Sequence, residues 1–96
     1  MNSKKEIETT LKKYKPILKE KFQVKEIGIF GSYVRGEATR QSDVDILVKF
    51  SRPIGWEFID LKEFLEKILN KKVDLVTIQA LKPQLKDIIL KEVVYA

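Results

Sequence analysis

The sequence contains neither cysteine nor histidine. Without cysteine the chain forms no disulfide bond, offers no thiolate nucleophile and builds no cysteine zinc site. Without histidine it lacks the general base of the Ser-His-Asp and Cys-His mechanisms and the commonest ligand of transition metals. Carboxylates remain as the groups for acid–base chemistry and metal binding, so any metal that binds here should be a hard cation such as Mg²⁺.

Long apolar runs are also missing from the sequence. The chain starts with charged amphipathic sequence and has no stretch typical of a signal peptide or a membrane span, so we expect a cytoplasmic protein that does not enter a membrane. Its 96 residues predict a single domain, 1–96, that buries roughly 60 to 65% of its unfolded surface. Such a domain is too small to enclose a polymeric substrate by itself.

Positive charge is in excess, with a net charge of +5, but it is dispersed. Lysines are scattered among glutamates on the predicted helix faces and seldom cluster. A scattered pattern is typical of a solvated surface, whereas a nucleic-acid footprint gathers basic residues on one face. The pattern favours a solvated surface over a nucleic-acid partner, although the net charge alone permits both.

Apolar periodicity predicts the helices and strands. A capping box at Ser3 and a helical apolar repeat predict helix over residues 3–22, which Pro16 divides into two pieces. Short β-branched segments predict three strands, at residues 24–30, 44–50 and 73–78. The other helical segments are a short turn at 32–36, a helix at roughly 56–69 and a closing helix near Pro83.

The lengths of the connections indicate how the strands pair. The link between the first two strands is short and favours antiparallel pairing, whereas the next link contains a whole helix and permits a right-handed parallel crossover. We therefore expect an α/β (α+β) fold in the order α-β-α-β-α-β-α. Its centre is a small three-stranded mixed sheet with helices packed on it.

A glycine and a serine directly follow the first predicted strand. A glycine there lets the backbone approach a ligand, and free amides at the start of the next helical turn can donate to phosphate oxygens. Gly31 and Ser32 therefore form a candidate phosphate site, beside which Arg35 contacts either a triphosphate or a structural carboxylate. A simpler interpretation stays open, with Gly31 as a strand terminator and Ser32 as an N-cap.

Two carboxylates lie two residues apart at the start of the second predicted strand. Because strand side chains alternate between faces, Asp43 and Asp45 project the same way, and they repel each other unless a cation lies between them. Mg²⁺ is commonly held by one or two carboxylates together with substrate phosphates. Combined with Gly31 and Ser32, the pair predicts a site for a nucleoside triphosphate and its metal ions. The alternatives are a solvated loop residue at Asp43 and an edge-strand charge at Asp45.

A third carboxylate interrupts the third predicted strand. Asp74 lies in an otherwise apolar segment, where an unpaired buried charge is costly. If this strand lies beside the second, three carboxylates can hold two magnesium ions that clamp the attacking and leaving oxygens at a phosphorus atom, with Asp74 accepting the proton of the acceptor hydroxyl. The alternative is an aspartate satisfied by neighbouring amides or by Lys71 or Lys72.

These motifs are similar to those of a known family. Gly31-Ser32, ten intervening residues and Asp43-Val44-Asp45 resemble the signature of the DNA polymerase β-like nucleotidyltransferase superfamily. The longer segments 31–39, 42–45 and 73–76 resemble the minimal nucleotidyltransferase (MNT) family, and the resemblance covers nearly the whole chain. The one departure is Val34, where alanine is frequent, and it touches none of the chemical groups.

The resemblance implies a nucleotidyltransferase fold and a magnesium-dependent enzyme. It implies that Gly31 and Ser32 bind the triphosphate, that Asp43 and Asp45 bind metal, and that Asp74 is the third metal carboxylate and the base. Many MNT proteins are antitoxins of a HEPN-domain ribonuclease, so the implied reaction is AMP transfer from ATP to a tyrosine hydroxyl of that toxin.

Two other functions stay open at this point. A binding module would neutralise its partner by occlusion, with nucleotide binding vestigial or structural. The other function is a nucleotidyltransferase that acts on RNA or on a small molecule, although the chain offers no separate domain to hold either substrate. The intact set of three aspartates favours the enzyme that modifies a protein partner.

Overall fold

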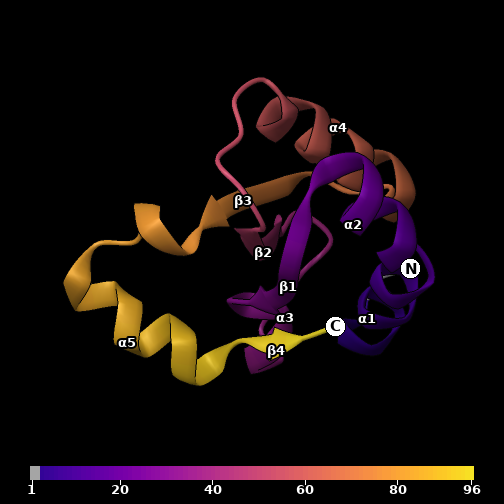
Figure 1. Cartoon of the computed structure of the whole chain (residues 1–96). Coiled ribbons are helices and arrows are strands. Elements are labelled where there is room, and N and C mark those ends of the chain that lie inside the picture. The colour runs from indigo at the N-terminus through magenta and orange to yellow at the C-terminus, as the bar shows by residue number, and fades with distance from the viewer. Residues whose placement is uncertain (1–2) are drawn as a thin grey trace.

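The computed structural model describes residues 3–96, which form a four-stranded sheet with helices (Figure 1). The helices are α1 (Lys4–Lys13), α2 (Lys15–Phe22), α3 (Ser32–Arg35), α4 (Glu57–Leu69) and α5 (Pro83–Glu92). The strands are β1 (Val24–Phe30), β2 (Val44–Phe50), β3 (Val73–Thr77) and β4 (Val94–Tyr95), and a 3₁₀ turn, η1, spans Ile78–Ala80. None of the helices in this described part is long and apolar enough to cross a membrane.

The strand order is β3-β2-β1-β4. β1 and β2 are antiparallel and β2 and β3 are parallel, so both predicted pairings are confirmed. The fourth strand is an addition to the predicted three, because two residues are too few to carry a strand pattern. In β4, Val94 and Tyr95 pair with Ile29 and Gly28 of β1. A Cβ atom at Gly28 would lie 2.6 Å from Cγ2 of Val93, so the missing side chain makes room for the end of the chain.

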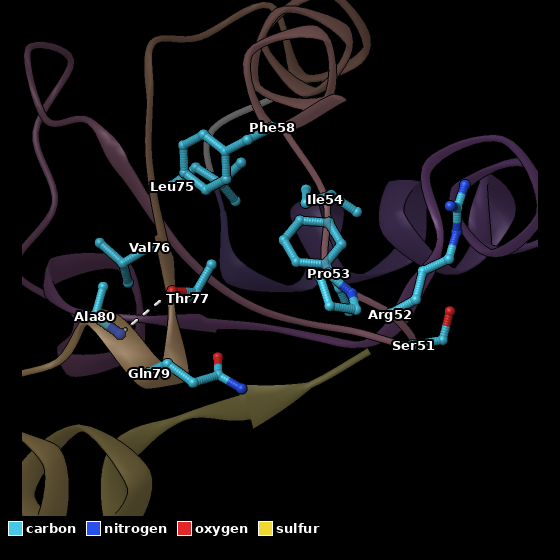
Figure 2. A pocket seen from close by; sticks show the side chains of 11 residues that line it. Ser51, Arg52, Pro53, Ile54, Phe58, Leu75, Val76, Thr77, Gln79 and Ala80 are labelled. Atoms are coloured by element: carbon cyan, nitrogen blue, oxygen red, sulfur yellow. Dashed lines mark hydrogen bonds between the residues drawn. The ribbon is translucent and has the colours of Figure 1, made fainter. Parts of the chain in front are cut away.

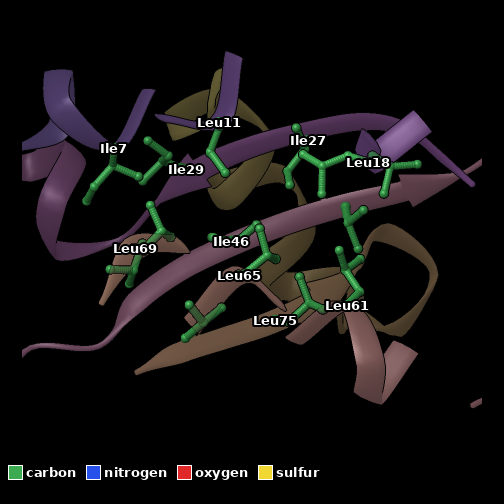
Figure 3. Close-up of a cluster of buried hydrophobic side chains, with 14 of the residues drawn as sticks. Ile7, Leu11, Leu18, Ile27, Ile29, Ile46, Leu61, Leu65, Leu69 and Leu75 are labelled. Carbon is green, nitrogen blue, oxygen red and sulfur yellow. The ribbon is translucent and has the colours of Figure 1, made fainter. Parts of the chain in front are cut away.

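The apolar core lies between one face of the sheet and helices α1, α2 and α4 (Figure 3). Leu11, Leu18 and Leu65 from these helices are fully buried against Ile29 and Ile46 of the central strands. Because side chains alternate along a strand, the neighbours of these residues project from the opposite face of the sheet. That face carries the predicted site.

Helix α5 does not share in this core. It contains no buried residue, and Leu85 and Ile88 expose 47% and 62% of their surface. In Figure 1 it lies apart from α1, α2 and α4. The apolar face of α5 is therefore largely exposed in this structure, and an apolar periodicity indicates a helix face that favours burial without specifying what covers it.

Candidate active site

The turn after β1 depends on a glycine for two reasons. Gly31 is buried and has φ 79° and ψ −149°, a backbone conformation that is essentially restricted to glycine. A Cβ atom there would also collide with Oδ2 of Asp45. The Gly31 carbonyl accepts hydrogen bonds from the N–H groups of Val34 and Arg35, at 3.0 and 3.1 Å, and so closes the single turn of α3.

Gly31, and not Ser32, is the N-cap of this turn. Ser32 is the first helical residue and is half-buried, so the interpretation of Ser32 as the N-cap is wrong. As in any helix, the N–H groups of Ser32 and Tyr33 have no acceptor within α3 itself. They are donors at the place where the sequence predicts a phosphate site.

Arg35 is bracketed by two carboxylates. Its Nε lies 2.8 Å from Oε1 of Glu37, and its Nη1 lies 2.8 Å from Oε1 of Glu92. The hydrogen bonds to Glu37 and Glu92 raise the pKa of Arg35 further above its usual value. Of the two roles left open for Arg35, the structure shows the contact with structural carboxylates.

Glu92 also reaches the backbone of the turn, because the Gly31 N–H donates to its Oε2 at 2.9 Å. Sequence reasoning missed this residue. It lies 61 positions after Gly31, in a helix whose other residues gave no site signal, and no local spacing connects the two. Only the C-terminal segment, folded back beside β1, brings them together.

The aspartates of β2 and β3 lie side by side. Asp45 and Asp74 are direct partners in the parallel register, and both alternate with core residues. Asp45 is half-buried and Asp74 is exposed. β2 is a central strand, so the edge-strand interpretation of Asp45 is wrong. Within residues 3–96, Asp74 forms no ion pair with a lysine, so Lys71 and Lys72 do not satisfy it.

Asp43 precedes β2 at the end of a polar loop and is exposed. Hydrogen bonds between Thr39 and Ser42 help to order the loop: Thr39 N–H donates to Ser42 Oγ at 2.8 Å, and Ser42 N–H donates to the Thr39 carbonyl at 3.1 Å. Asp43 is near enough to act on Asp45 electrostatically. Burial, followed by the charges of Asp74 and Asp43, raises the pKa of Asp45 to about 6, with Arg35 opposing the shift.

The carboxylates suit a hard cation, although they do not form a finished metal cage. Among the described residues no group of three acidic side chains is already gathered closely enough to hold a metal ion. The chemistry of Asp45 nevertheless fits one, because a cation beside Asp45 and Asp74 would offset both the burial of the Asp45 charge and its repulsion by the neighbouring aspartates, which raise its pKa. Substrate phosphates commonly supply the remaining oxygen ligands of magnesium.

The raised pKa of Asp45 predicts a pH-dependent stability. An unfolded aspartate releases its proton near pH 4, whereas folded Asp45 keeps it to about pH 6, so the metal-free fold loses stability as the pH rises through this range. Allowing for solvent screening at a half-buried site, we expect a loss of about 1 to 2 kcal/mol. Urea unfolding of the wild type and of Asp45→Asn between pH 4 and pH 7 measures it.

The comparison with Asp45→Asn is needed because Glu57 and Glu92 have lowered pKa values and change stability in the opposite direction. The unfolding free energy of the wild type should fall relative to that of the variant as the pH rises. A difference that stays constant from pH 4 to pH 7 would contradict the placement of Asp45 in this acidic cluster.

A separate hollow of about 750 Å³ lies at the other end of β2 and β3 (Figure 2). Phe50, Phe58 and Leu75 contribute its apolar wall, and Arg52 and Gln79 contribute polar groups. None of the predicted site residues lines it. The hollow is therefore distinct from the aspartates, which lie at the starts of the same strands.

In a comparison with protein families, residues 11–96 match the model of the nucleotidyltransferase domain. Among individual proteins, the chain is 53% identical over 91 residues to the protein adenylyltransferase MntA of Thermococcus cleftensis, covering 94% of this chain and 92% of the relative. It is 46% identical over 99 residues to a Methanocaldococcus jannaschii chain assigned as a protein adenylyltransferase, covering 99% of both.

Solved structures agree with these sequence matches. A chain assigned as a minimal nucleotidyltransferase superimposes with a TM-score of 0.75 at 32% identity, covering 92% of this chain and 93% of the other. A toxin–antitoxin crystal structure with AMP-PNP superimposes with a TM-score of 0.68 at 25% identity, covering 96% of this chain and 70% of the other. The similarity extends over nearly the whole fold described above.

Proposed function

The chain belongs to the nucleotidyltransferase domain family, and on this premise we propose that it is a protein adenylyltransferase that transfers AMP from ATP to a tyrosine hydroxyl of a HEPN-domain toxin. The pairing of Asp45 with Asp74, next to the Gly31 turn, is the observation that carries the proposal. On the face of the sheet opposite the core, this arrangement places two carboxylates that suit a hard cation beside the first N–H groups of α3, which have no acceptor within that helix. By modifying its partner, the chain acts as an antitoxin.

In the proposed reaction the tyrosine oxygen attacks the α-phosphorus of ATP. A bond forms between that oxygen and the α-phosphorus, the bond from the α-phosphorus to the bridging oxygen breaks, and pyrophosphate leaves. The hydroxyl proton passes to the carboxylate of Asp74, which is exposed on the edge strand β3 and so lies open to a partner protein. Ser32 and the N–H groups at the start of α3 orient the triphosphate.

Magnesium fits this scheme at Asp45 and Asp74, with Asp43 beside them, and two ions match the expectation from sequence. When bound, it would neutralise charge on the phosphates and on the leaving pyrophosphate. ATP is the proposed donor because the relatives are named adenylyltransferases and a similar structure contains AMP-PNP.

A labelling experiment tests the function. The protein is incubated with Mg²⁺ and ATP labelled at the α-phosphate, together with the protein product of the neighbouring reading frame, as the candidate partner, or with bulk RNA. We expect label on the partner protein and none on RNA, with transfer falling at least about 100-fold when EDTA removes the metal.

ATP labelled at the γ-phosphate is the matched control. It should leave no label on the partner, because nucleotidyl transfer releases the γ-phosphate within pyrophosphate. Label from the γ-position would indicate a kinase, and label on RNA would indicate a different acceptor; either result contradicts the proposal.

A further inference from the structure

Glu92 connects the C-terminal end of the fold to the candidate nucleotide turn. Its two carboxylate oxygens bind two different parts of that turn: Oε2 accepts from the Gly31 N–H at 2.9 Å, and Oε1 lies 2.8 Å from Nη1 of Arg35. Only 16% of the Glu92 side chain is exposed. Both oxygens are thus already used by the two ends of a single helical turn.

The position of Glu92 depends on the strand that follows it. Helix α5 buries no residue of its own, so its packing does not hold Glu92 in place. Two residues later, β4 pairs with Gly28 and Ile29 of β1, and the Ala96 N–H donates to the Ile27 carbonyl at 2.9 Å. The same strand, β1, leads directly into Gly31. The pairing of β4 with β1 therefore holds Glu92, which directly precedes this C-terminal segment, beside the strand that leads into the turn.

The turn needs such a support. Gly31 has the widest conformational freedom of any residue type, and its backbone adopts a conformation that few other residues share. Gly31 is a buried residue, and a buried N–H without an acceptor is costly. Burial raises the pKa of Glu92, but the hydrogen bond from Gly31 and the ion pair with Arg35 outweigh this and lower it, so Glu92 is ionised at neutral pH. Bonds to an ionised acceptor are the stronger kind.

We propose that Glu92 is a positioning residue for the nucleotide: it holds Gly31 and Arg35 so that the first N–H groups of α3 are already oriented for a triphosphate. The inference rests on the proposed function. Glu92 does not itself touch the nucleotide, because both of its oxygens face the turn. Its effect is preorganisation, which reduces the entropy lost when the ligand binds.

The test compares Glu92→Ala and Glu92→Gln with Asp87→Ala, a control at an exposed position of the same helix. Binding is measured with α,β-methylene-ATP, whose α–β bridge is not cleaved, in the presence of Mg²⁺. We expect Glu92→Ala to weaken binding about tenfold and to raise the KM for ATP by a similar factor, while kcat at saturating ATP changes less than about threefold. Glu92→Gln should restore part of the loss, because its amide oxygen still accepts from Gly31.

Hydrogen exchange of the Gly31 amide supplies a readout that needs no nucleotide. Exchange should quicken in Glu92→Ala and stay unchanged in Asp87→Ala. Thermal melting shows whether each variant is folded. If Glu92→Ala does not fold, Glu92→Gln is compared with the wild type in its place. Tighter binding by Glu92→Ala would overturn the inference, since it would mean that the carboxylate competes with the triphosphate; unchanged binding would overturn it equally.

The two proposals fail in different ways. If the wild type binds no α,β-methylene-ATP and modifies no partner, the proposed function is wrong, and the Gly31 amide still decides whether Glu92 fixes the turn. If the wild type binds and the Glu92 variants bind equally well, only the positioning role is wrong.

Discussion

Replacing Asp45 with asparagine is expected to lower AMP transfer at least about 1,000-fold while the folded state becomes more stable at pH 7. Asparagine has nearly the same shape, but it lacks the negative charge that a hard cation and the reacting phosphates require. In the absence of metal that same charge is unfavourable, because burial and the neighbouring aspartates disfavour it. If the variant is inactive and yet more stable than the wild type, the loss of activity does not result from unfolding.

Transfer of label to the partner and urea unfolding at pH 7 measure the two effects on the same preparations. The double variant Asp43→Asn/Asp45→Asn adds a test of the occlusion hypothesis. If this variant still neutralises the partner fully while transferring no label, neutralisation does not need the chemistry and the enzyme hypothesis fails. We expect instead that neutralisation is lost along with transfer.

Replacing Gly31 with alanine should be the most damaging single change to the fold at this site. The variant must adopt a backbone conformation that is essentially closed to alanine, and its Cβ would meet the Asp45 carboxylate. We expect a loss of about 3 kcal/mol in unfolding free energy. Transfer should fall below detection, because Asp45 and the turn cannot both keep their places.

Gly36 provides a matched control at the other end of the same turn. It also has a positive φ, of 74°, but a Cβ atom there would meet nothing within 4 Å. Gly36→Ala should therefore cost only about 1 kcal/mol and leave transfer within a few fold of the wild type. Equal effects of the two substitutions, measured by urea unfolding and by label transfer, would show that close packing against Asp45 is unimportant.

Local patterns in the sequence predict most of what is near in the chain. The β1 bounds and the glycine turn that follows this strand are predictable from strand alternation and turn chemistry, which act over a few residues. The neighbourhood of Asp45 and Asp74 follows as well, because a helix between two strands favours a parallel crossover.

What the sequence does not predict depends on contacts between distant segments. The two residues of β4 are too few to show an alternation, and Glu92 has no spacing relation to the turn that it binds. The apolar residues of α5 follow a helical period, but periodicity says nothing about whether this chain or another molecule covers them. The assignment of Asp43, Asp45 and Asp74 to metal stays a prediction, as do the roles of Ser32 and Arg35 in nucleotide binding.

The pairing of β4 with Gly28 and Ile29 of β1 determines when the nucleotide turn becomes anchored during synthesis. A chain that is synthesised from its N-terminus presents Gly31 long before Glu92, and the two lie 61 residues apart. The antiparallel pair of β1 and β2 is more local and can form early, whereas contacts between distant segments form late and slowly. A product cut short by its last five residues would keep all three aspartates yet leave the turn unanchored. Full affinity for the nucleotide would thus arrive only once residues 92–96 have been synthesised and have paired with β1.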